Sequence, residues 1–166
     1  MDYLTENNIY ERIRSEVKKA RQKVYATVNL TMVETSWNIG KQIYEAQDKS
    51  ERAEYGKGLL KFLSQKLTKE FGKGFTVTNL KYMRQFYMAF PNSHSLSDQL
   101  SWTHYRMLLK VEDEKIRNFY LKECEKSNWS TRQLERQINS LYYQRLLSSP
   151  DKDSIRDKIH TLEKAS

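Results

Sequence analysis

Five side chains between residues 73 and 85 are of the types that bind phosphate groups and the edges of nucleic-acid bases: Lys73, Thr78, Lys81, Arg84 and Gln85. Lysine and arginine neutralise phosphates, and threonine, lysine and glutamine can hydrogen-bond to base edges. On a helical wheel Thr78, Lys81 and Gln85 share one polar face, with Arg84 at its edge. We therefore predict that Lys73 and Arg84 contact phosphates while the other three side chains face a groove of duplex DNA.

A helix-turn-helix unit over residues 52–90 is expected to position these side chains. The first helix shows an apolar face at helical spacing, formed by Leu59, Leu60, Leu63, Leu67 and Phe71. Gly72 and Gly74 then allow the chain to reverse. Thr76 is suited to cap the second helix, and Pro91 marks its end. The apolar face of this second helix comprises Leu80, Met83, Tyr87 and Phe90.

Positive charge is concentrated in the same unit. Residues 52–90 hold eight basic and two acidic residues, so they account for +6 of the net charge of +8. The basic residues are Arg52, Lys57, Lys61, Lys66, Lys69, Lys73, Lys81 and Arg84. Focused positive charge is typical of a surface that meets a polyanion. The alternative is a solvated basic hairpin that binds no ligand.

A second helix-turn-helix candidate follows near the C-terminus. The segment Ser130 to Gln133 matches a capping box, which predicts a helix running to about Leu147. Its apolar side holds Leu134, Ile138 and Leu141, and its polar side offers a second candidate DNA-binding stripe of Arg132, Arg136 and Asn139. An ordinary solvated face explains this second stripe equally well.

Residues 5–47 are predicted to be helical almost throughout. The narrow apolar stripe of this segment, Ile9, Ile13, Val17, Ala20, Val24 and Val28, resembles a coiled-coil seam of about three heptads. We expect it to pair with another helix, from the same chain or from a second copy in a homo-oligomer. Weak helix formers predict a kink or break between Thr31 and Ser36. Trp37 and Gly40 indicate close packing against a neighbouring helix.

Composition favours an all-α protein of six or seven helices. The chain is 38% hydrophobic and 30% charged, with five glycines, two prolines and 20 aromatic residues. We expect a helical domain over residues 1–147 and a linker or terminal helix over 148–166. No apolar run is long enough to span a membrane, so we expect no membrane partner. The single cysteine, Cys124, cannot form a disulfide within the chain, so we expect a reducing, cytoplasmic location.

No catalytic constellation is evident in the sequence. His94, His104 and His160 are scattered without the spacing of metal ligands, and no glycine-rich loop has the spacing of a phosphate-binding motif. We therefore expect no metal, no cofactor and no enzymatic activity in these 166 residues.

Several strings of residues, in order, resemble the N-terminal domain of the YhcG-type bacterial proteins. They include IYERIRSEVKKARQKV, WNIGKQI, AEYGKGLLKFLSQKLTKEFGKGF, NLKYMRQFYMAFP, LSWTHYRMLL and NWSTRQLERQI. The resemblance covers residues 8 to 146. It implies a helical, helix-turn-helix-like DNA-binding module ahead of a C-terminal nuclease domain of the PD-(D/E)XK superfamily. We expect no such nuclease domain within the 166 residues, so no catalytic residue is carried over.

Two functions follow as predictions. The first is a DNA-binding N-terminal module of a PD-(D/E)XK-type nuclease, acting through the basic helix-turn-helix. The alternative is a helical oligomerisation or protein-interaction module of a nuclease or restriction-like complex, supported by the long N-terminal helix.

Overall fold

The computed structural model describes residues 3–48 and 53–164, and all regular structure in these ranges is helical, as predicted. Arg52 lies outside the described residues. The helices are α1 Tyr3–Asp48, α2 Ala53–Phe71, α3 Val77–Ala89, the 3₁₀ helix η1 Ser93–Ser95, α4 Trp102–Leu108, α5 Glu114–Ser127, α6 Thr131–Asn139, α7 Tyr142–Ser148 and α8 Lys152–Lys164. The described ranges thus hold eight α-helices, slightly more than the six or seven expected.

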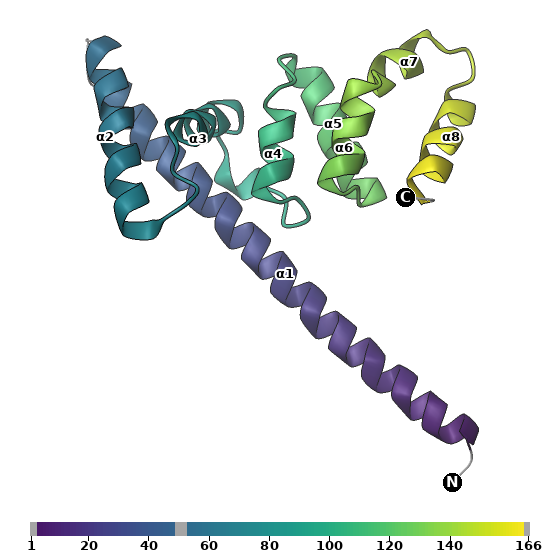
Figure 1. Ribbon diagram of the computed structural model, residues 1–166. Coiled ribbons are helices and arrows are strands. Elements are labelled where there is room, and N and C mark those ends of the chain that lie inside the picture. Colours follow the sequence, from purple (N-terminus) through teal and green to yellow (C-terminus); the bar gives the residue numbers. More distant parts are fainter. Residues whose placement is uncertain (1–2, 49–52, 165–166) are drawn as a thin grey trace.

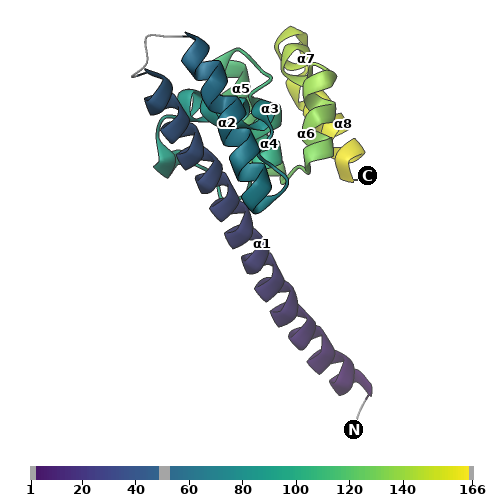
Figure 2. The same cartoon turned by 60° about the vertical axis from the view of Figure 1, so that its left-hand side comes forward.

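Helix α1 is continuous over 46 residues, about 69 Å at 1.5 Å per residue. The predicted kink or break between Thr31 and Ser36 is therefore wrong. The hydroxyl groups of Thr27, Thr31 and Thr35 each donate to the carbonyl four residues earlier, at 2.8 Å. These side chains are thus satisfied within the helix. Figures 1 and 2 show that only the C-terminal half of α1 lies against other helices, while its N-terminal half projects away from them.

Helix α3 packs closely against the C-terminal half of α1. A Cβ atom on Gly40 would lie 1.9 Å from the main-chain oxygen of Met83, so the two backbones leave room only for glycine. The indole nitrogen of Trp37 donates to the carbonyl of Phe90 at 2.6 Å, just beyond the end of α3. The predicted close packing at Trp37 and Gly40 is confirmed.

Two apolar cores meet at α3. The smaller core joins α1, α2 and α3 through Ile43, Leu60, Leu80 and Met83. The larger core extends from Val33 and Trp37 of α1 through Phe86 of α3 to Ile159 of α8. Because α3 contributes to both cores, its orientation is fixed from two sides, and its remaining face is left to solvent.

The helix predicted from residue 131 to about 147 is two helices. Leu141 adopts a left-handed conformation with φ of 57°, and it separates α6 from α7. Beyond this break Tyr142 is fully buried, and the Tyr120 hydroxyl accepts a hydrogen bond from the main-chain N–H of Tyr143 at 3.1 Å. Leu141, expected on the apolar side, is instead exposed. Burial of Tyr142 in the core compensates for the local break.

The two capping residues predicted from the sequence, Thr76 and Ser130, are confirmed. Thr76 caps α3, Ser101 caps α4, Asp113 caps α5, and Ser130 forms a capping box with Gln133 at the start of α6. After the loop at residues 149–151, α8 folds back against the preceding helices through buried Ile159 and Glu163. The domain boundary between residues 147 and 148 remains a prediction.

Candidate nucleic-acid interface

A well-defined turn connects α2 to α3 and exposes Lys73. Gly72 and Gly74 have φ angles of 85° and 107°, which glycine adopts at little cost. The Asn79 side chain donates to the carbonyl of Gly74 and accepts from the indole nitrogen of Trp102 at 3.3 Å. The turn is therefore tied to α3 and, through Trp102, to α4. The sequence reasoning overlooked Asn79, because the helical wheel ranks it only as polar.

The exposed face of α3 agrees with the helical wheel. Thr78, Lys81 and Gln85 are exposed, while Leu80 and Met83 are buried. The structure adds Met88 to the exposed face and places Asn79 and Phe86 among the buried residues of α3. Tyr87 and Phe90, expected on the apolar face, are half-buried. The three predicted groove-facing residues thus lie along one accessible side of the helix.

Both edges of this face are anchored to neighbouring helices. On the α1 side, the guanidinium of Arg84 lies over the Tyr44 ring, 5.5 Å from its centroid. On the α4 side, Arg106 lies 4.9 Å from the ring centroid of Tyr82. Cation–π contacts of this kind add modest stability and hold both side chains near the protein surface. Arg84 is half-buried and sits at the edge of the face, as predicted.

The α2–α3 unit is strongly basic at its surface. Residues 56–90 carry seven basic side chains and one acidic side chain, Glu70. The basic residues are Lys57, Lys61, Lys66, Lys69, Lys73, Lys81 and Arg84; the six lysines are exposed and Arg84 is half-buried. None of the ion pairs within the described residues involves any of them. Their charge is thus available to an external polyanion.

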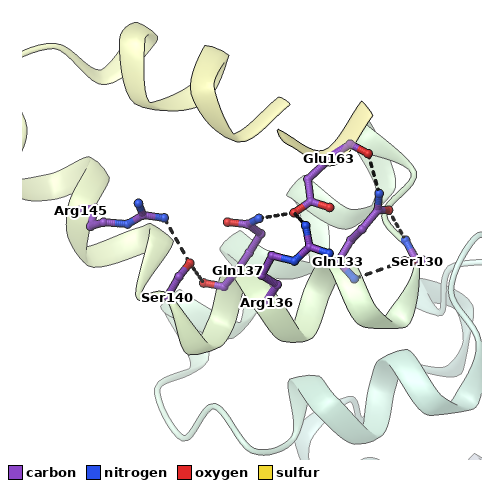
Figure 3. Close-up of polar contacts among 7 residues, drawn as sticks. All are labelled: Ser130, Gln133, Arg136, Gln137, Ser140, Arg145 and Glu163. Carbon is purple, nitrogen blue, oxygen red and sulfur yellow. Dashed lines mark hydrogen bonds and ion pairs between the residues drawn. The ribbon is translucent and has the colours of Figure 1, made fainter. Parts of the chain in front are cut away.

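The second candidate stripe lies on α6, next to α8. Arg132 and Asn139 are exposed. Arg136 is also exposed, but it pairs with the carboxylate of Glu163, with Nη1 3.2 Å from Oε1. Glu163 also accepts from the Gln137 amide at 2.5 Å. Figure 3 shows these side chains of α6 converging on Glu163. The middle residue of the stripe is therefore neutralised within the protein, whereas Lys81 is not.

Gln133 extends this network to the backbone. Its amide nitrogen donates to the Glu163 carbonyl at 3.0 Å, and its oxygen accepts from the main-chain N–H of Ser130 at 2.7 Å. One side chain thus closes the capping box and fixes the end of α8, as Figure 3 shows. Gln133, Arg136 and Gln137 of α6 thus connect this helix to α8.

The buried titratable groups are held by packing. Burial raises the pKa of the Cys124 thiol to about 12, as expected for a small core side chain. Burial lowers the pKa of His104, whose Nε2 lies 2.8 Å from the Trp129 carbonyl.

Within residues 3–48 and 53–164, no three His, Cys, Asp or Glu side chains gather in a way that could hold a metal ion. Among the described helices, none is both long and apolar enough to cross a bilayer.

The chain belongs to the family described as the DUF1016 N-terminal domain, whose model matches residues 12–145. It is 33% identical to the Escherichia coli (strain K12) protein named "Putative nuclease YhcG". That match covers 89% of this chain and 48% of the relative, so the chain spans about half the length of this curated relative. No solved structure matches the chain. The resemblance to the YhcG-type N-terminal domain is thereby confirmed.

Proposed function

We propose that this chain is a DNA-binding module that engages duplex DNA through the α2–α3 unit. The observation that carries the proposal is the set of seven basic side chains on this unit, none of which is neutralised by an ion pair within the described residues. Lys73 at the turn and Arg84 at the edge of α3 would contact phosphates. Thr78, Lys81 and Gln85 would face the groove.

The similarity to the YhcG relative also supports a role in DNA binding. The chain matches about half of the relative named "Putative nuclease YhcG", and it matches a family defined by an N-terminal domain. We propose that the module holds DNA for a C-terminal nuclease domain in the full-length relatives, while the 166 residues themselves bind DNA without cleaving it. Metal-dependent cleavage of DNA by this chain alone would contradict the second part of this proposal.

A salt-dependent binding measurement tests the proposal. Fluorescence anisotropy of a labelled duplex should show affinity that falls steeply with salt, because binding to phosphates releases counterions. The plot of log K against log salt has a negative slope, and each phosphate contact removed should reduce its magnitude by about 0.9. We expect this reduction for Lys73→Gln.

Lys122→Gln is a matched control, because Lys122 is also exposed but lies on α5. It should leave both the affinity and the salt slope unchanged. Absence of binding at low salt would overturn the proposal. An equal loss of DNA affinity from Lys73→Gln and Lys122→Gln would show that DNA is attracted by the overall charge of the protein and not bound at a localised interface.

The oligomerisation alternative has an observation of its own, the exposed apolar stripe of α1. It is compatible with DNA binding by α3, because the exposed half of α1 projects away from the α2–α3 unit (Figure 1).

A further inference from the structure

The N-terminal half of α1 carries apolar surface that nothing else in the described chain covers. Every residue from 5 to 25 is exposed. We call this projecting N-terminal half of α1 the arm, and its apolar side the arm stripe. The arm stripe consists of Ile9, Ile13, Val17, Ala20, Val24 and Val28, and its five larger side chains are 47% to 62% exposed. A contiguous exposed apolar surface of this kind marks an interaction site.

The arm stripe lies on the side of α1 that faces away from the body of the protein. At 100° per residue its six positions fall within a band about 100° wide, roughly opposite Val33, Trp37 and Gly40. Those three residues pack α1 onto the other helices. Beyond Val28 the same side of α1 turns polar at Thr31 and Thr35, both exposed. The helices of the same body therefore cannot cover the stripe while α1 stays continuous.

A projecting helix of this length gains little stability from its own side chains. The ion pairs Arg14–Glu11 and Lys19–Glu16, at 3.4 and 3.7 Å, are exposed, and exposed pairs stabilise weakly. Most helical stability in proteins comes from packing of an apolar face against another element. The arm thus has the surface for such packing and lacks the partner within the described chain.

We propose that the arm stripe is a homodimerisation surface on which the arm of a second copy packs antiparallel. The spacing along the stripe is four, four, three, four and four residues, which reads identically from either end. A two-fold axis at its midpoint therefore aligns every apolar position with another. The resulting pairs between copies are Ile9 with Val28, Ile13 with Val24, and Val17 with Ala20.

The repeat also shows how the two arms would fit. Ile9, Ile13 and Val17 are each followed eleven residues later by another member of the stripe, so the spacing follows an eleven-residue repeat in place of the predicted heptads. Such a repeat, at 3.67 residues per turn, stays close to the natural period of the helix. Two nearly straight arms can then remain in contact along the stripe, which spans about 30 Å.

Charge favours a second copy in this orientation. Residues 5–18 carry three acidic and three basic side chains, whereas residues 19–32 carry three basic side chains and no acidic one. A parallel pair would place the two +3 halves side by side, and an antiparallel pair places each against a neutral half. Glu16 and Lys23 share one edge of the stripe. Antiparallel pairing brings Glu16 of one copy and Lys23 of the other to within two residues of each other along the helix axis, about 3 Å.

The opposite edge is basic and aromatic. Antiparallel pairing brings Arg14 of one copy near Arg21 of the other, and this contact between like charges opposes the dimer. Tyr10 and Tyr25 flank these arginines on the same edge and are 60% and 71% exposed. Their ring faces can receive the guanidinium groups, which reduces the repulsion.

Sedimentation equilibrium of the 166-residue chain tests the association. The mass should rise with concentration from 19.9 kDa towards twice that value. Ile13→Glu with Val24→Glu should hold the chain at the monomer mass. The matched control, Asn8→Glu with Ser15→Glu, adds the same charge on the other side of the arm and should leave the dimer intact. A wild-type chain that stays monomeric throughout the micromolar range would overturn the proposal.

Folding of these variants can be checked separately, because no residue of the arm stripe belongs to either apolar core. The double glutamate variant should keep the near-ultraviolet circular dichroism of the body and lose helical signal from the arm. Loss of both signals would indicate unfolding. Ile13→Ser with Val24→Ser, which removes apolar surface without adding charge, then provides the test.

Disulfide trapping tests the orientation. Cys124 is buried, so an added cysteine is the accessible thiol. A mixture of Ile9→Cys and Val28→Cys chains should give a mixed disulfide, and Ile9→Cys alone should not crosslink, because its two copies lie about 28 Å apart along the axis. Efficient crosslinking of Ile9→Cys alone would show a parallel pair and overturn the antiparallel arrangement.

Discussion

The side-chain amide of Gln85 donates a hydrogen bond to the main-chain carbonyl of Leu109, with Nε2 3.2 Å from the oxygen. This bond ties the exposed face of α3 to the C-terminal end of α4. Lys81, one turn earlier on the same face, has no ion pair with another described residue. Two neighbouring residues of the proposed interface therefore differ, because Gln85 also supports the fold and Lys81 is available to a ligand.

We expect Lys81→Ala to weaken DNA binding several-fold and to leave thermal stability unchanged. Gln85→Ala should instead lower the free energy of unfolding by about 1 kcal/mol, the usual contribution of one such hydrogen bond. Urea unfolding and fluorescence anisotropy on both variants separate the two effects. A Lys81→Ala chain that loses stability would show that the lysine packs against the fold.

Replacing Glu163 should cost stability rather than DNA affinity. Its side chain is 5% exposed, and Glu163→Ala leaves the buried amide of Gln137 without the oxygen to which it donates. We expect a loss of about 2 kcal/mol, measured by urea unfolding, because an unpaired buried donor carries its full desolvation penalty. Unchanged stability would mean that α8 contributes little to the fold.

Exposed Arg132 on α6 distinguishes the two candidate interfaces. Arg132→Ala should change DNA affinity less than Lys81→Ala, with both variants measured by anisotropy at the same salt concentration. The reverse order would move the interface to α6.

Gly40→Ala should destabilise the protein by about 1–3 kcal/mol, the usual cost of overpacking a tight contact. The added methyl would lie 1.9 Å from the Met83 carbonyl oxygen, so α1 and α3 must separate. Gly58→Ala is the matched control, because it lies in α2 with no atom within 4 Å of the added Cβ. That control should stabilise the protein by about 0.5–1 kcal/mol through helix propensity. Equal effects of the two substitutions on thermal unfolding would contradict the close α1–α3 contact.

Stability should depend on pH through His104. Its Nδ1 accepts from the main-chain N–H of Ser101 at 3.0 Å, and its Nε2–H donates to the Trp129 carbonyl, so the neutral ring fits the site. Burial lowers the pKa of His104 in the folded state, and the unfolded chain therefore binds the proton first, near pH 6.5. Neutral His104 therefore contributes fully to the free energy of unfolding above about pH 6.5. This contribution is lost as the pH falls through the lowered pKa of His104 in the folded state.

Urea unfolding from pH 7.5 to 5.5 measures this effect. His104→Gln should be less stable at pH 7.5 and should show a weaker fall with acidification. The exposed His94 supplies the control, since His94→Gln should keep the wild-type dependence. An unchanged pH profile in His104→Gln would assign the fall to other groups.

Local features of the sequence predicted much of the helical framework. Thr76 and Ser130 cap helices as expected, because a cap depends on atoms within a few residues. Gly72 ends α2 for the same local reason. The exposed face of α3 also followed from helical periodicity, since an amphipathic helix turns its apolar side inwards wherever the core lies.

The sequence by itself determined the all-α class, the order of α2, turn and α3, and the basic character of the α2–α3 unit, since these depend on local periodicity and composition. Tertiary packing decided that the helix predicted after Ser130 breaks at Leu141. The break allows Tyr142 to be buried in the core, and residues close in sequence do not indicate where that core lies. It also decided which polar side chains are engaged. Arg136 pairs with Glu163, 27 residues away in sequence, and only the folded chain brings them together.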